Sequence, residues 1–147
     1  MNYKTILMAH DFSDSGGRAL ERAAELARAN GATLHLLHVV EYLPPVDTSF
    51  GAVSPFEVDL TDQMVESSRT RLTALGAEMG IPADRCWVEV GSPKLEVIRI
   101  AEEIEADLIV VGSHGRHGIA LLLGSTASSV VHHAKCDVLA VRLPEED

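Results

Sequence analysis

The sequence predicts a single-domain α/β protein, a three-layer α/β/α sandwich built on a five-stranded parallel sheet of strand order 3-2-1-4-5. Short apolar runs, typical of strands buried on both faces, alternate along the chain with longer segments whose apolar residues recur at helical spacing. Right-handed connections between parallel strands then favour this order. With 147 residues, 46% of them hydrophobic, the chain is long enough for one compact domain and too short for two typical ones. We therefore expect one domain over residues 1–147.

The first part of the chain predicts two strands and one helix. The apolar run Lys4–His10 predicts the first strand, which ends at Asp11. Either Ser13 or Asp14 can cap a helix that continues to Asn30 and that Gly31 terminates. The second strand is expected over residues 33–40.

The middle of the chain predicts a loop and a long helix. The connection Glu41–Pro55 contains proline, serine and acidic residues, and it is the best candidate for a mobile loop. A helix is expected from near Asp59 to Met79, followed by Gly80 and Pro82. Its inward residues would be Val65, Leu72, Leu75 and Met79.

The last part of the chain repeats the alternation of strands and helices. In this part Ser92 is expected to cap a helix with Pro93 in its first turn. The expected elements are a strand over Arg85–Val90, a helix over Lys94–Glu105, a strand over Asp107–Val111, a helix over Ser125–Ala134 and a final strand over Asp137–Leu143. Inward residues of the helix after Ser92 would be Val97, Ile100, Ala101 and Ile104.

Composition argues against several classes of function. The net charge of −10 argues against nucleic-acid binding, which needs clustered lysine and arginine. No apolar run reaches the roughly 18 residues of a membrane span, and the N-terminus shows no cleavage-site pattern. We therefore expect a cytoplasmic protein without membrane insertion. Cys86 and Cys136 are expected to be reduced and partly buried, and the histidines lack the spacing of a metal site.

The loop between the fourth strand and the last helix is the most informative segment. It contains Gly112, Gly115, Gly118 and Gly124, and glycine lets a backbone adopt positive φ and approach a ligand closely. A helix that opens at Gly124 would present unpaired N–H groups and its positive dipole end to that loop, which suits a phosphate. In a sheet of order 3-2-1-4-5, the ligand crevice lies between strands one and four. Asp11 and this loop therefore fall at the same crevice.

The chain resembles the universal stress protein family over nearly its whole length. The resemblance is carried by Ile6-Leu-Met-Ala-His-Asp-Phe-Ser13, Leu36-Leu-His-Val-Val40, Gly91-Ser-Pro93, Asp107-Leu-Ile-Val-Val-Gly-Ser-His-Gly115 and Gly124-Ser-Thr126. It implies a Rossmann-like fold of the adenine nucleotide alpha hydrolase type. The family's ATP-binding branch has Gly, two residues, Gly, nine residues and then Gly-Ser or Gly-Thr. Here eight residues separate Gly115 from Gly124, a loss of at most about 3.5 Å of reach that Gly118 could absorb.

The resemblance implies an ATP site. Asp11 would contact the adenosine part through the ribose, and Val39 would contact adenine. Val111 and Gly112 would line the nucleotide. The phosphates would be held by Gly115, Gly124, Ser125 and Thr126, and a Mg²⁺ ion would be held largely by phosphate oxygens.

The resemblance also implies a role. We expect a cytoplasmic, ATP-binding regulator that acts through protein contacts or oligomerisation. It is not expected to be an enzyme, although slow ATP hydrolysis is compatible with this role. The family commonly dimerises through its final strand, here Asp137–Leu143, and some relatives regulate membrane transporters. The partner of this chain is not identified by its sequence.

Alternatives stay open at this point. Asp11 could instead cap the first helix, and Ser125 and Thr126 are good N-cap residues without any ligand. His10 and His114 could act as general bases only if a substrate hydrogen lay within reach.

Two further functions compete with the ATP-binding regulator. One is a dimerising stress module that binds no nucleotide. The other is an adenylating enzyme of the ATP pyrophosphatase type, for which Ser15-Gly16-Gly17 is a short match. That match fails at Arg18, where the enzyme loop continues with an Asp-Ser pair.

Overall fold

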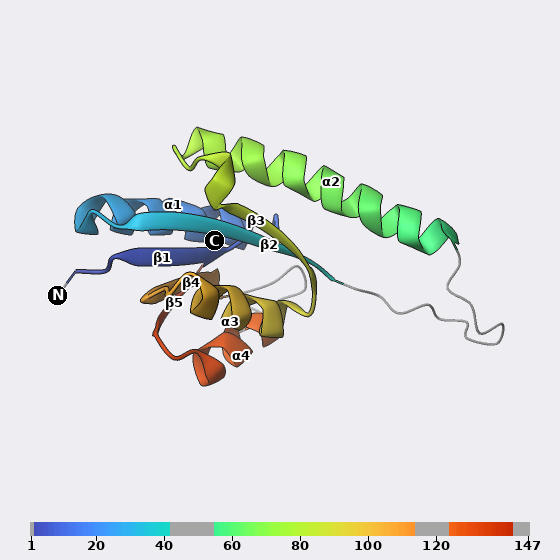
Figure 1. The fold of residues 1–147 in the computed structure, drawn as a ribbon. Helices are drawn as coiled ribbons and strands as arrows, with labels where there is room; N and C mark the ends of the chain where they lie inside the picture. The colour runs from blue at the N-terminus through green and yellow to red at the C-terminus, as the bar shows by residue number, and fades with distance from the viewer. Residues whose placement is uncertain (1, 42–54, 114–123, 143–147) are drawn as a thin grey trace, which may run out of the picture.

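The computed structural model describes residues 2–41, 55–113 and 124–142, and side chains at 55–59 are outside this description. Strands and helices alternate along the chain (Figure 1). The elements are β1 (Thr5–Ala9), α1 (Asp14–Asn30), β2 (Thr33–Glu41), α2 (Pro55–Glu78), the 3-10 turn η1 (Ala83–Arg85), β3 (Cys86–Gly91), α3 (Pro93–Glu103), β4 (Leu108–Gly112), α4 (Ser125–His133) and β5 (Asp137–Val141).

The five strands form one parallel sheet in the order β3-β2-β1-β4-β5, which confirms the predicted fold class and strand order. β1 lies in the centre, where Ala9 pairs with Leu37 of β2 on one side and Val111 of β4 on the other. The two strands on either side of the switch in strand order, β1 and β4, are therefore direct neighbours. Their carboxyl ends form one edge of the sheet.

The helices cover both faces of the sheet (Figure 1). On one face, α1 and α2 enclose a buried cluster with the alternate side chains of the strands. On the other face, α3 and α4 enclose a second cluster with the remaining alternate side chains. The first cluster includes Ile6, Met8, Ala19, Ala23, Leu36, Leu72 and Val110, and the second includes Leu7, Leu37, Val39, Val97, Ile100, Ile109, Val111 and Val130.

The bounds of the elements differ from the prediction mostly by one or two residues, which is the normal uncertainty of frayed ends. The larger error is at the start of α2, which begins at Pro55 and not near Asp59. A proline in the first turn of a helix costs little because its missing N–H would have no helical partner there. The expected mobile loop lies largely at residues 42–54, outside the described residues, as does Leu143 of the expected last strand.

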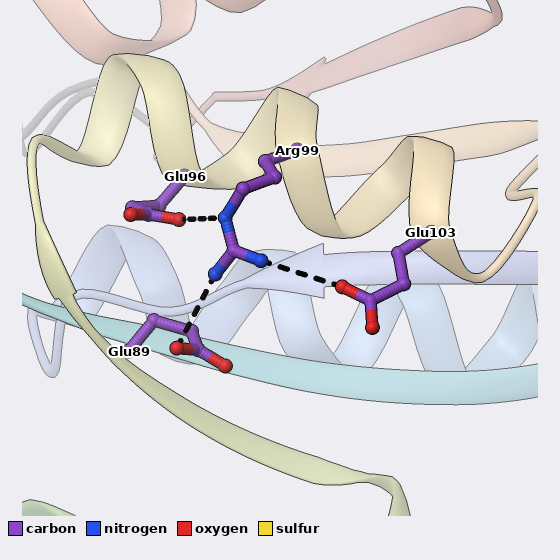
Figure 2. A network of polar contacts seen from close by, with 4 residues as sticks. All are labelled: Glu89, Glu96, Arg99 and Glu103. Atoms are coloured by element: carbon purple, nitrogen blue, oxygen red, sulfur yellow. Dashed lines mark hydrogen bonds and ion pairs between the residues drawn. The ribbon is translucent and has the colours of Figure 1, made fainter.

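Arg99 of α3 contacts three carboxylates, two of α3 itself and that of Glu89 on the edge strand β3 (Figure 2). Its guanidinium nitrogens lie 2.5 Å from Glu96, 3.3 Å from Glu89 and 3.4 Å from Glu103. The hydrogen bond to Glu96 and the other carboxylates raise the pKa of Arg99. Because the arginine side chain is half exposed, solvent screens these pairs, and the contact orients α3 more than it stabilises the fold.

Two smaller expectations concern the cysteines and the membrane. Cys86 and Cys136 are free and partly buried, as predicted, and burial raises the pKa of both thiols. Among the described helices, none is both long and apolar enough to cross a bilayer.

Candidate functional site

The carboxyl edge of β1 and β4 is where the chain leaves the sheet in two directions. After β1 it enters α1 on one face, and the next helix after β4 is α4 on the other face. In sheets of this kind a ligand usually binds in a crevice at such a switch in strand order, so this edge is the candidate crevice. Asp11 lies just past β1, and Gly124 opens the helix on the far side of the crevice.

Asp11 stabilises the loop between β1 and α1 through hydrogen bonds. Its Oδ1 accepts a hydrogen bond from the Ser13 N–H at 3.0 Å and another from the Ser13 hydroxyl. Ser13 is the N-cap of α1, because its Oγ accepts from the Gly16 N–H at 3.1 Å. The alternative that Asp11 caps this helix is therefore wrong. In the described part of the chain, no partner is recorded for Asp11 Oδ2, which is available to a ligand hydroxyl.

Within the residues that the structure describes, no side chain caps the N-terminus of α4. Gly124 is the N-cap, so the expectation that Ser125 or Thr126 could fill this role is wrong. The Gly124 N–H donates to the Ser113 carbonyl at 2.7 Å, and the Ser113 N–H donates to the Val141 carbonyl at 2.9 Å, which ties α4, β4 and β5 together. First-turn amides without a side-chain acceptor, at the positive end of the helix dipole, attract an anion.

Val39 and Val111 form an apolar wall near the carboxyl ends of β2 and β4. Both are buried, and both belong to the cluster under α3 and α4. They therefore lie on the face of the sheet that carries α4. A flat apolar group could lie against this wall while a polar group reached Asp11 or the first turn of α4.

Gly112 has a structural reason to be glycine. A Cβ at this position would lie 2.5 Å from the hydroxyl oxygen of Ser15, in the first turn of α1. The sequence-based argument, in which loop glycines adopt positive φ, is wrong for the two described members, because Gly124 has a φ of −60° and Gly112 is not among the positive-φ residues. Close packing, not unusual backbone geometry, requires Gly112.

The predicted site residues therefore fall into two groups. The structure brings Asp11, Val39, Val111, Gly112, Gly124, Ser125 and Thr126 to the carboxyl edge of the sheet. Gly115, Gly118 and His114 lie outside the described residues.

His10 faces away from the crevice. Its buried ring lies on the face that carries α1 and α2, beside Phe12 and Gly16. Its Nδ1 accepts a hydrogen bond from the Phe12 N–H at 2.8 Å. This placement removes the geometric basis for His10 as a general base at the crevice.

Sequence reasoning missed a group of residues on that same face. Phe12 has a φ of +63°, unusual for a residue with a side chain, and its ring stacks on His38 at 4.2 Å between centroids. The Arg71 guanidinium carbon lies 4.2 Å from the Phe12 ring centroid. Nothing in the local sequence signals this arrangement, because it joins the loop after β1 to residues of β2 and α2.

Comparison with known proteins gives one consistent family. Residues 2–142 match the model of the universal stress protein family. Universal stress protein A homolog 2 of Coxiella burnetii is 43% identical over 143 residues, which cover 97% of this chain and 97% of the relative.

Solved structures agree with this family. Universal stress protein UspA from Lactobacillus plantarum has a TM-score of 0.82 and 26% identity, covering 97% of this chain and 99% of its own. A universal stress protein solved in complex with cAMP has a TM-score of 0.61 and 29% identity, covering 97% of this chain and 98% of its own.

Proposed function

This chain belongs to the universal stress protein family, and from that premise we propose that it is a nucleotide-responsive regulator whose ligand is ATP. The observation that carries the proposal is the pairing of two unsatisfied features across one crevice. Among the described residues, no side chain caps the N-terminus of α4, and no hydrogen bond is made by Oδ2 of Asp11. The first favours a phosphate and the second favours a sugar hydroxyl, so together they favour a nucleotide.

Each candidate residue has a role in this proposal. Asp11 accepts from the ribose, and Val39 contacts adenine on the apolar wall. Val111 and Gly112 line the nucleotide at the end of β4. The phosphates are held at Gly115 and by the amides and hydroxyls of Gly124, Ser125 and Thr126. Mg²⁺ would neutralise the phosphates and be held largely by their oxygens. The relative solved with cAMP supports an adenine nucleotide as the ligand class.

The regulatory output that we propose rests on a backbone connection between the candidate site and β5. A nucleotide shifts a protein between two states only if it binds them with different affinity. The Ser113 backbone connects the first turn of α4 to the end of β5, which pairs only with β4 in the described sheet. We propose that nucleotide binding changes the geometry of β5, through which two copies pair as a homodimer in the cytoplasm. The dimer would then contact a protein partner, for which a membrane transporter is one candidate.

We propose binding rather than catalysis as the function. In the described residues, Asp11 Oδ1 is engaged by Ser13, and His10 lies on the other face of the sheet. Efficient catalysis of hydrolysis or group transfer needs a positioned acid or base within reach of the reacting atoms. Any ATP turnover should accordingly be slow.

Calorimetric titration of nucleotide-free protein with ATP, ADP, AMP and cAMP, with and without Mg²⁺, tests this proposal. We expect saturable ATP binding that weakens as phosphates are removed, because the α4 N-terminus contributes through the phosphates. Absence of saturable ATP binding would overturn the proposal and favour a nucleotide-free dimerising module. Tighter binding of cAMP than of ATP would reassign the ligand, and release of pyrophosphate with an acceptor would favour an adenylating enzyme.

A further inference from the structure

A hollow lies on the face of the sheet that carries α1 and α2, opposite the face that carries α4. It is a groove of about 660 Å³ lined by residues of α1 and α2 together with His10 and Phe12. This volume lies within the range of about 300–1,000 Å³ that small-molecule sites occupy. The groove requires none of the residues assigned above to the nucleotide.

His10 lines the groove and offers it a hydrogen-bond donor. The residue is 6% exposed, and its Nδ1 accepts from the Phe12 N–H, so the proton of the neutral ring is on Nε2. Burial is the main reason that the pKa of His10 is lowered to about 4, which keeps the ring neutral at physiological pH. In the described part of the chain, Nε2 has no recorded hydrogen-bond acceptor. A ligand oxygen in the groove would satisfy this donor.

Arg71 places a positive charge beside this donor. Its guanidinium lies over the Phe12 ring, and no ion pair of Arg71 is recorded within the described ranges. The ring of Phe12 is held by stacking on His38, although its own backbone is in the left-handed region. A donor and a guanidinium that line one groove favour the carboxylate of a ligand.

The exposed rim of the groove carries charges of both signs. Arg18 and Arg71 are positive, whereas Asp14, Glu21 and Glu78 are negative. This balance disfavours a polyanion such as a nucleoside triphosphate. It favours a molecule that presents one negative group inward and one positive group to the rim carboxylates.

We propose that the groove between α1 and α2 binds a small zwitterion, a molecule with one carboxylate and one ammonium group, such as a free α-amino acid. The carboxylate accepts from His10 Nε2–H and lies near Arg71. The ammonium group lies at the rim, where Asp14, Glu21 and Glu78 attract it. The inference does not depend on nucleotide binding at the opposite face.

Nuclear magnetic resonance on the nucleotide-free full chain tests this site. The imidazole nitrogens of His10 are followed while glycine, acetate or methylammonium is added at constant ionic strength. Glycine should shift the Nε2 resonance saturably, acetate should bind more weakly, and methylammonium alone should leave the resonance unchanged. No saturable shift with glycine, or an equal affinity for acetate, would overturn the proposal.

Variants separate the site from general effects on the fold. Arg71→Met should lower glycine affinity about tenfold in calorimetry, whereas Arg28→Met, an exposed arginine at the far end of α1, should not change it. His10→Leu removes the donor and should abolish binding, while His10→Gln keeps an N–H donor and should retain part of it. If His10→Leu does not fold, the Arg71→Met variant still tests the proposal. A glycine affinity of Arg71→Met equal to that of the parent protein would refute binding in this groove.

Discussion

The hydroxyl of Ser15 lies against the backbone of Gly112, where a Cβ would stand 2.5 Å from Ser15 Oγ and 3.2 Å from the Ser15 main chain. Ser15 is in the first turn of α1, and Gly112 is the last residue of β4. The contact therefore sets how closely α1 approaches the strand that ends at the candidate site. The hydroxyl is buried and has no hydrogen-bond partner in the described part of the chain.

We expect Gly112→Ala to destabilise the protein. The added methyl group meets both a side chain and the main chain of α1, and overpacking of this kind costs about 1–3 kcal/mol. Chemical denaturation measures the loss. Gly17→Ala is the matched control, because a Cβ at Gly17 meets no atom within 4 Å and alanine favours the helix. Equal stability of Gly112→Ala and the parent protein would contradict the close approach.

Ser15→Ala and Ser13→Ala should have opposite effects on the free energy of unfolding. Removing the unpartnered hydroxyl of Ser15 relieves a desolvation cost and should stabilise by about 1 kcal/mol. Removing the Ser13 hydroxyl removes the cap of α1 and should destabilise by about 1 kcal/mol. The same denaturation experiment on both variants tests the pair. A loss of stability in Ser15→Ala would mean that its hydroxyl has an acceptor.

Asp11→Asn separates the two roles of this side chain. An asparagine oxygen can still accept from the Ser13 N–H, but the second oxygen becomes an N–H₂ group that cannot accept from a ribose hydroxyl. We expect ATP affinity to fall about tenfold while stability changes little. Calorimetry of ATP binding gives the readout, with Asp14→Asn in the first turn of α1 as the charge-matched control. Undiminished ATP affinity would remove Asp11 from the site.

Stability should fall as the pH drops from 6.5 towards 4, in part because of His10. Burial lowers the pKa of His10 from 6.5 to about 4, against the opposing charge of Asp11. Between these values the unfolded chain binds a proton that the folded protein does not, so unfolding is favoured by up to roughly 3 kcal/mol. Above pH 6.5 the ring is neutral in both states, and this contribution vanishes.

Unfolding of His10→Gln across the same pH range checks this account of His10. The variant lacks the titrating group, so its curve should be flatter between pH 6.5 and 4, and the carboxylates common to both proteins cancel in the difference. Parallel curves for the two proteins would show that His10 is accessible to protonation in the fold.

Gly115→Val tests the part of the ATP site that rests on the sequence motif. A branched side chain where the phosphates are expected should abolish ATP binding and leave the unfolding curve unchanged. Gly115 lies outside the described residues, so the expectation rests on the glycine pattern and the family resemblance alone. Normal ATP affinity of the variant would show that the phosphates bind elsewhere.

The strand order and the edge that carries the candidate site could be predicted from the chain itself. Apolar runs such as Lys4–His10 and helical stripes such as Val97 and Ile100 are local patterns. Handedness and the switch in strand order then leave few topologies, and they bring Asp11 and Gly124 to one edge of the sheet. These inferences succeed because they depend on the period of secondary structure and on general rules of connection.

Only the tertiary structure decided which atoms form hydrogen bonds and on which face of the sheet each side chain lies. Ser13 rather than Asp11 caps α1, His10 turns away from the crevice, and Gly112 is required by Ser15 of another element. The positive φ of Phe12 accompanies contacts with His38 and Arg71, which no local pattern contains. Such features depend on pairs of residues that are distant in sequence, so packing, not periodicity, determines them.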